Sequence, residues 1–322
     1  MIRSRPIAVG HYLPERVVPN AEFETMVDTS DEWIRQRTGI ERRHFAADGE
    51  LTSDLAIAAA QDAFKRFNVD PQTIDGILVA TSTPDQTFPA TATRVQAALG
   101  ITHGFAFDLQ AVCAGFAYAL ANADALIRAG TAKRMLVIGA ETFSRILDFT
   151  DRRTCVLFGD GAGCLILEAL ESNDPSAPGV IATDLRADGQ FNDILYVDGG
   201  VSSTQTVGVL KMEGQEVFKH AVTKLANAAL RVMDKAGMTS LDITKVVPHQ
   251  ANLRIIKSVS QKLNLSMDQI VVTVQDHGNT SAASIPLALS VAEHRGEISE
   301  GDVILFEAIG GGLAWGAALM RW

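Results

Sequence analysis

Apolar and polar residues along this chain form helix-like and strand-like segments that follow one another. The segment 53–67 has an alanine-rich apolar face behind Ser53, which predicts an amphipathic helix with a serine N-cap. Short, continuous apolar runs are typical of strands that are covered on both faces. These patterns predict helices at 53–67, 113–129, 217–236 and 281–295, and strands at 76–83, 105–109, 135–141, 154–168 (two strands around a glycine turn), 245–249, 270–274 and 303–308.

The order of the elements in the second half repeats the order in the first. A shift of 166 residues places Cys113 on Asn279, and a shift of 169 aligns two of the predicted strands. We therefore predict two similar α/β halves, 1–170 and 171–322. If these halves pack about a pseudo-two-fold axis, equivalent strand-to-helix turns meet near the axis, and Cys113 and Asn279 face one another.

The composition excludes several classes of protein. With 47% hydrophobic and 20% charged residues over 322 positions, the chain can fill a large core and is not disordered. Its net charge of −10 and the lack of a basic run argue against nucleic-acid binding. The most apolar long stretch, 111–127, is short for a bilayer span, so we expect no membrane segment.

The cysteines indicate a reducing compartment. Cys113, Cys155 and Cys164 are too widely spaced for a metal knuckle and too few for a disulfide framework. The first residues show no apolar run of the kind found in secretory signals. We therefore expect a cytoplasmic protein with free thiols and no bound metal.

Three polar residues stand where α/β proteins place their sites. Cys113 lies between a predicted strand and a predicted helix, and the positive end of that helix favours a thiolate. His249 follows an apolar strand, and Asn279 precedes a helix. Each also has a plain structural interpretation: an inert buried thiol, a core histidine and a turn asparagine.

Two glycine clusters were tested as functional loops. Gly159–Gly163 leads into a predicted strand, whereas a dinucleotide-binding loop must open a helix, so we exclude a nucleotide site. Gly310–Gly312 follows a strand, and its backbone N–H groups could stabilise an oxyanion. The alternative for this second cluster is a tight bend between core strands.

Cysteine, histidine and asparagine in this order fit two chemistries. A papain-like hydrolase uses histidine to deprotonate cysteine, and the spacings of 136 and 166 residues after Cys113 fall near those of such proteases. The protease context Cys-Gly-Ser-Cys-Trp is missing, however. The other chemistry is carbon–carbon bond formation through an acyl-cysteine, with His249 and Asn279 as paired donors to a thioester oxygen.

Six motifs resemble those of the β-ketoacyl-acyl carrier protein synthase III family, which initiates fatty acid synthesis: Thr29–Arg43, Cys113–Phe116, Phe158–Gly163, His249–Ile256, Gly278–Ser284 and Gly310–Gly316. Elongating synthases carry a histidine where this chain has Asn279, and thiolases use a second cysteine. The resemblance implies a thiolase-like fold, in which two duplicated α/β halves with five-stranded sheets form a layered αβαβα sandwich. It also implies a homodimer.

The resemblance implies a two-stage mechanism. Cys113 takes an acyl group from a short acyl-CoA, expected to be acetyl-CoA, while the backbone N–H groups of Cys113 and Gly311 hold the oxyanion. Malonyl-acyl carrier protein then loses CO₂, and its enolate attacks the acyl-cysteine. His249 and Asn279 stabilise the charge on the malonyl thioester oxygen. No metal or redox cofactor is implied.

The same resemblance assigns binding residues. They are Trp33, Arg37 and Arg152 for coenzyme A, Phe88 (from the partner subunit) and Phe143 for the acyl pocket, and Gln250, Arg254 and Lys257 for the carrier protein.

Three positions depart from the family pattern. Ile309 replaces a common phenylalanine, and Arg153 replaces a small residue, for which we have no account. Phe143 replaces an aliphatic residue, which predicts a narrower pocket and short primers. A synthase III-like enzyme of a specialised polyketide or quinolone pathway, a Cys-His-Asn thioester hydrolase and a silent acyl-binding subunit are the alternatives.

Overall fold

Two β-sheets form the frame of the molecule, and a computed structural model describes all 322 residues. The first sheet has the strand order β1-β7-β6-β4-β5, and the second has the order β11-β12-β13-β8. Their strands are β1 (Ile2–Tyr12), β4 (Gly76–Ala80), β5 (Phe105–Leu109), β6 (Arg134–Glu141), β7 (Gly161–Glu171), β8 (Gly179–Ala187), β11 (Lys245–Pro248), β12 (Val303–Gly310) and β13 (Ala314–Arg321). Two small sheets pair β2 (Arg16–Pro19) with β3 (Arg42–Phe45) and β9 (Leu195–Val197) with β10 (Leu210–Met212).

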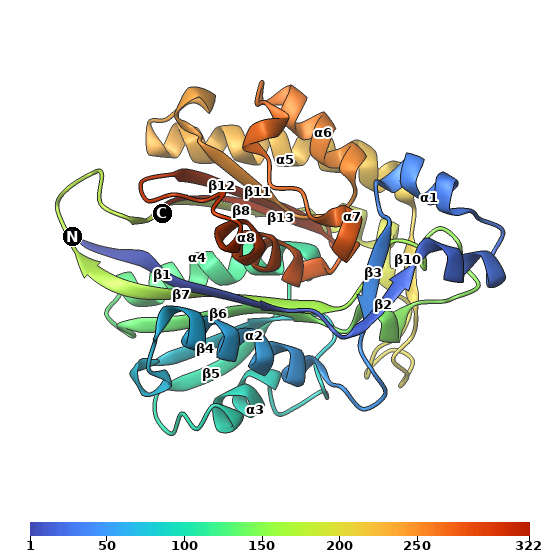
Figure 1. Cartoon of the computed structure of the whole chain (residues 1–322), viewed down its shortest axis with the longest axis horizontal. Coiled ribbons are helices and arrows are strands. Elements are labelled where there is room, and N and C mark those ends of the chain that lie inside the picture. Colours follow the sequence, from blue (N-terminus) through green and yellow to red (C-terminus); the bar gives the residue numbers. More distant parts are fainter.

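Helices cover both faces of both large sheets, which gives five layers (Figure 1). Helices α4 (Gly115–Arg128) and α8 (Ser284–His294) lie between the sheets, α2 (Thr52–Phe67) and α3 (Thr91–Ala98) cover the first sheet, and α5 (Gly214–Ala236) and α6 (Leu253–Lys262) cover the second. The remaining helices are α1 (Asp31–Thr38) and α7 (Val274–His277). The two central helices are rich in apolar residues because they are enclosed by sheets above and below, whereas α2 buries one face only. The αβαβα sandwich is confirmed.

Most of the predicted elements are confirmed, but two segments differ. The run 154–168 is not a pair of strands: 154–160 forms turns, because Phe158 and Gly159 pair with Asn279, and β7 begins only at Gly161. The glycine cluster there does lead into a strand, as expected. The sequence patterns did not predict β1, β8 and β13.

The segment 270–274 is not a strand either. Ile270 forms a single bridge with Val246, so the second sheet has four strands rather than the implied five. The side-chain oxygen Oε1 of Gln250 then accepts hydrogen bonds from the N–H groups of Thr273 and Val274, at 2.9 and 3.1 Å. These bonds hold the chain in the turn that starts α7 and end the pairing with β11.

The repeat is real in the strand register, but its offset is 169 rather than 166 at the site. Ile77 pairs with Leu136 in the first sheet, and the positions 169 residues later, Val246 and Leu305, pair in the second. Two 3₁₀ turns, η3 (Val112–Ala114) and η8 (Ser281–Ala283), are related in the same way. The counterpart of Cys113 is therefore Ala282, and its predicted equivalence with Asn279 is wrong. The division at residue 170 stays a prediction.

The helices of the structure include none with both the length and the apolar character needed to cross a membrane.

Close packing of α8 on β7 depends on Gly163. A Cβ atom built there would lie 2.5 Å from the carbonyl carbon of Pro286 and would collide with the backbone nitrogen of Leu287. Backbone atoms cannot move aside as a flexible side chain can, so the helix would have to leave the sheet.

The substitution Gly163→Ala should therefore destabilise the fold by about 3 kcal/mol or more. Gly189→Ala is the matched control, since a Cβ there meets nothing within 4 Å. Urea denaturation followed by fluorescence measures both. Equal midpoints for the two variants would contradict the proposed close packing.

Candidate active site

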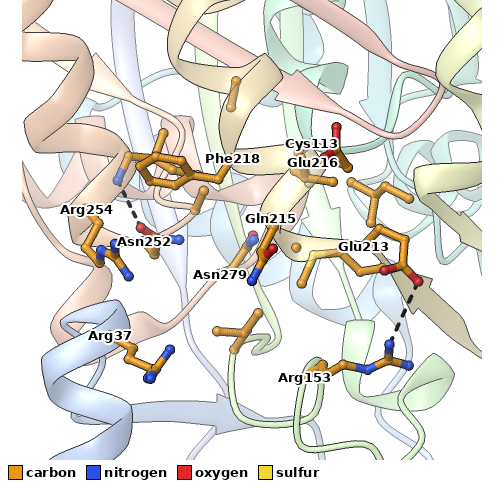
Figure 2. Close-up of a pocket in the computed structure, with 18 of the residues that line it drawn as sticks. Arg37, Cys113, Arg153, Glu213, Gln215, Glu216, Phe218, Asn252, Arg254 and Asn279 are labelled. Atoms are coloured by element: carbon orange, nitrogen blue, oxygen red, sulfur yellow. Dashed lines mark hydrogen bonds and ion pairs between the residues drawn. The ribbon is translucent and has the colours of Figure 1, made fainter.

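Cys113, His249 and Asn279 line one cavity of about 980 Å³ (Figure 2). The cavity lies at the end of both large sheets: Cys113 belongs to η3, His249 directly follows β11, and Asn279 lies just before η8. Each side chain is almost completely buried. The sequence-predicted residues that come from three distant segments are thus brought together.

The nucleophile turn is held against the glycine bend after β12. A Cβ atom on Gly310 would lie 2.6 Å from the backbone nitrogen of Cys113, so only glycine lets the bend approach this closely. The N–H of the next residue, Gly311, donates no hydrogen bond within the protein. This geometry places a free backbone donor beside Cys113, as an oxyanion site requires.

Cys113 rests as a thiol, not as the thiolate predicted from the helix dipole. Burial raises the pKa of Cys113 to about 12, and the nearby Glu141 carboxyl raises it further. The hydroxyl of Ser281 lowers the pKa but does not offset the loss of solvation. Desolvation therefore outweighs the dipole, because the α-helix itself begins only at Gly115.

His249 is a neutral side chain whose hydrogen bonds define its tautomer. Its Nδ1 lies 2.7 Å from the hydroxyl oxygen of Ser284, which also accepts the N–H of Gln250 at 3.3 Å. The hydroxyl has no other acceptor, so its proton points at Nδ1 and the ring proton sits on Nε2. Burial lowers the pKa of His249 to about 3. The ring therefore offers a neutral N–H donor to the cavity.

Asn279 is oriented by three backbone contacts. Its Oδ1 accepts the N–H of Ser281 at 2.9 Å, which identifies the other amide atom, Nδ2, as the donor that is left free. The backbone N–H of Asn279 donates to the carbonyl of Leu157 at 2.9 Å, and its carbonyl accepts the N–H of Gly159 at 3.0 Å. Two N–H donors, from His249 and Asn279, thus share the cavity with the Cys113 thiol.

The mouth of the cavity is rich in arginine. The guanidinium groups of Arg37 and Arg152 both lie 4.8 Å from the centre of the Trp33 ring. Arg153 also lines the cavity and forms an ion pair with Glu213 at 3.8 Å (Figure 2). The mouth therefore combines an aromatic surface with several cations, which suits a planar base that carries phosphates.

The predicted carrier-protein residues divide into two groups. Arg254 and Lys257 are exposed on α6, and Arg254 lines the cavity mouth. Gln250 is wrong as a surface contact, because it is buried. Its amide nitrogen donates to the carbonyls of Pro248 and Val271, at 2.9 and 3.1 Å, so it fixes the backbone around His249 instead.

The predicted acyl-pocket residues lie outside the main cavity. Phe143 lines a second cavity of about 310 Å³ together with Val112 and Leu195, and its ring stacks on Phe158 at 4.8 Å between centroids. Leu195 and Phe158 also line the main cavity. Phe88 is 81% exposed and lines neither cavity.

Sequence reasoning assigned no role to Ser281 or Ser284. Both belong to the run Asn279–Ser284, and Ser284 is one helical turn away from Ala288 on the buried helix α8. A hydroxyl in so apolar a helix is a signal of a specific hydrogen bond. Its partner, His249, is 35 residues away along the chain, so only the fold reveals the pair.

No group of three or more His, Cys, Asp or Glu side chains could hold a metal ion.

Comparison with known proteins gives consistent results along the whole chain. Residues 107–189 match the family model of 3-oxoacyl-[acyl-carrier-protein] synthase III, and residues 233–322 match the model of its C-terminal part. The chain is 63% identical to the beta-ketoacyl-[acyl-carrier-protein] synthase III of Cereibacter sphaeroides, over 100% of this chain and 99% of the relative.

Solved structures agree. The structure is similar to that of beta-ketoacyl-[acyl carrier protein] synthase III from Thermus thermophilus, with 46% identity, 99% coverage of both chains and a TM-score of 0.94. It is also similar to the priming β-ketosynthase of the R1128 polyketide pathway, with 34% identity, 99% and 96% coverage and a TM-score of 0.92. By sequence and by fold, the chain belongs to the β-ketoacyl-acyl carrier protein synthase III family of condensing acyltransferases.

Proposed function

We propose that the cavity condenses a short acyl-CoA with malonyl-acyl carrier protein through an acyl-Cys113 intermediate. The products are 3-ketoacyl-acyl carrier protein, free coenzyme A and CO₂. The observation that carries this proposal is the pair of neutral donors, His249 and Asn279, beside a buried thiol. The chemistry needs neither a metal nor a redox cofactor, because it consists of acyl transfer and decarboxylation.

The first stage moves the acyl group to Cys113. The sulfur attacks the thioester carbonyl, whose oxygen becomes negative and accepts the backbone N–H groups of Cys113 and Gly311. Coenzyme A leaves as its thiol and carries the proton that the Cys113 thiol gives up, so no net charge is left in the cavity. A raised thiol pKa suits this exchange, because an uncompensated thiolate would be costly in so buried a site.

The second stage needs donors that are not cations. When malonyl-acyl carrier protein loses CO₂, its electrons move into the thioester, whose oxygen gains charge and accepts the N–H groups of His249 and Asn279. A protonated His249 would instead pair with the malonyl carboxylate and hold back its loss. The low pKa of His249 keeps the ring neutral, so it stabilises the enolate and not the carboxylate.

The mouth would hold the two large substrates. Trp33, Arg37 and Arg152 can bind the adenine and phosphates of coenzyme A, with the base replacing one of the two guanidinium groups on the indole ring. Arg254 and Lys257 form a local positive surface on a chain of net charge −10. That surface fits an acidic carrier protein, and its attraction should weaken with salt.

The second cavity gives the acyl chain a place next to Cys113. The Phe143–Phe158 stack limits its size, which favours a short primer such as acetyl. A homodimer fits the exposed ring of Phe88 and the unpaired edge strand β5, on which Phe107 is also exposed. In that dimer, Phe88 would enter the acyl pocket of the partner. The cytoplasmic location stays a prediction.

Mass spectrometry of the intact protein tests this function. Acetyl-CoA should add one acetyl group to the wild-type chain but not to the Cys113→Ala variant. Malonyl-acyl carrier protein should then remove that group and yield acetoacetyl-acyl carrier protein.

Two outcomes would contradict the proposal. Release of free acetate without a new carbon–carbon bond would indicate a thioester hydrolase. An adduct that forms with a longer or branched acyl-CoA but not with acetyl-CoA would assign the chain to a specialised pathway.

Ser284→Ala should slow the second stage selectively. Without its hydroxyl, Nδ1 of His249 has no donor, and the ring proton is free to move from Nε2 to Nδ1. We expect CO₂ release from malonyl-acyl carrier protein to fall about tenfold or more, while acetylation of Cys113 changes little.

Ser290→Ala is the control for that experiment. Ser290 is a buried serine on the same helix, but it contacts His11 and Arg66 and lines no part of the cavity. Isotope-labelled malonyl substrate measures CO₂ release in all three proteins. If Ser284→Ala slows both stages to the same extent, the tautomer assigned to His249 is wrong.

A further inference from the structure

A completely buried arginine lies directly behind Asn279. Arg43 belongs to β3 and has no solvent-accessible surface. Its guanidinium donates to the carbonyl of Val18 at 3.1 Å, to Oδ1 of Asn20 at 2.8 Å and to the carbonyl of Val156 at 2.6 Å, and it lies 4.7 Å from the ring centre of Phe23. The substrate mechanism described above makes no use of it.

This arginine has no carboxylate partner. The ion pairs of the protein do not include it, although burial of an unpaired charge is costly. Burial lowers the pKa of Arg43 to about 10, so the group still carries its charge at neutral pH. Its charge is compensated only by the two carbonyl oxygens and the amide oxygen that it binds. A group retained at this cost has a purpose that a leucine would not serve.

The aliphatic part of Arg43 packs against two glycines on either side of Asn279. A Cβ atom on Gly278 would lie 3.0 Å from the Cβ of Arg43, and one on Gly159 would lie 2.9 Å from the same atom. Gly278 also has a φ of +64°, which a side chain would strain. The glycine motif around residue 159, which binds no nucleotide, thus makes room for the arginine.

The two loops that carry these glycines hold Asn279 between them. Leu157 and Gly159 each form one backbone hydrogen bond with Asn279, and Phe158 forms the bridge with it. Arg43 fixes the first of these loops through the carbonyl of Val156, one residue before Leu157. A shift of Val156 would therefore move the acceptor that positions the Asn279 backbone.

We propose that Arg43 is a positioning residue for Asn279: its donation to Val156 and its packing on Gly159 and Gly278 fix the amide that stabilises the enolate. This inference rests on the proposed role of Asn279. Arg43 touches no substrate and lines no part of the cavity. It should act on the second stage and not on the transfer of the acyl group to Cys113.

Arg43→Met is the most direct test, because it keeps the aliphatic contacts with the glycines and removes the donors. We expect CO₂ release from malonyl-acyl carrier protein to fall by up to about a hundredfold through a lower kcat, as a displaced donor would cause. Acetylation of Cys113 by acetyl-CoA should change less than about twofold. Arg43→Lys keeps a charged donor and should recover part of the lost rate.

A double-mutant cycle separates positioning from general loosening. If Arg43 acts only through Asn279, then Arg43→Met should cost little in a chain that already carries Asn279→Ala. Arg66→Met is the control, since it removes another partly buried guanidinium, bonded to Ser290 and Glu293, away from the cavity. It should leave the ratio of the two stages unchanged.

Three results would overturn the proposal. They are an equal loss in both stages, a full additional loss on top of Asn279→Ala, and no loss at all in Arg43→Met. If the methionine variant does not fold, Arg43→Lys provides the same comparison of stages. A normal rate of CO₂ release in Asn279→Ala alone would instead refute the proposed role of Asn279, which separates the two failures.

Discussion

The active site depends on the close contact of two short turns with the ends of the opposite sheets. Turn η3, which carries Cys113, lies against Gly310 at the end of β12, and turn η8 lies against Gly139 on β6. A Cβ on Gly139 would lie 2.8 Å from the carbonyl carbon of Ala282. Both contacts need a residue without a side chain. They bring the nucleophile of one half into the cavity that holds His249 and Asn279 of the other.

The same burial determines the electrostatic character of the site. In so dry a cavity each ionisable group prefers its neutral form, which raises the pKa of Cys113 and lowers that of His249. A thiol and a neutral imidazole suit acyl exchange and decarboxylation, since neither stage then has to separate charge. Buried Glu141, whose pKa is raised to about 7, adds no second full charge in the acidic range. Polar side chains here act mainly as oriented dipoles.

Local pattern predicted most of the fold and all three central residues, but not their environment. Helix α2 and strand β4 follow from periodicity alone, because each is covered in the usual way. The segment 270–274 has a strand-like sequence, yet Gln250 takes its N–H groups, a contact across 23 residues that no window contains. The carrier-protein role of Gln250 failed for the same reason. The thiolate prediction failed because the helix dipole is a local property, whereas desolvation depends on the whole fold.

The state of His249 is the most direct test of the account. Nitrogen-15 NMR of protein labelled in its histidines, with His249→Gln for assignment, reports which ring nitrogen carries a proton. The account predicts a protonated Nε2, an unprotonated Nδ1 and no titration of His249 between about pH 5 and about pH 8. A ring that titrates near the ordinary histidine pKa, or one that carries its proton on Nδ1, would contradict the claim that a neutral donor stabilises the enolate.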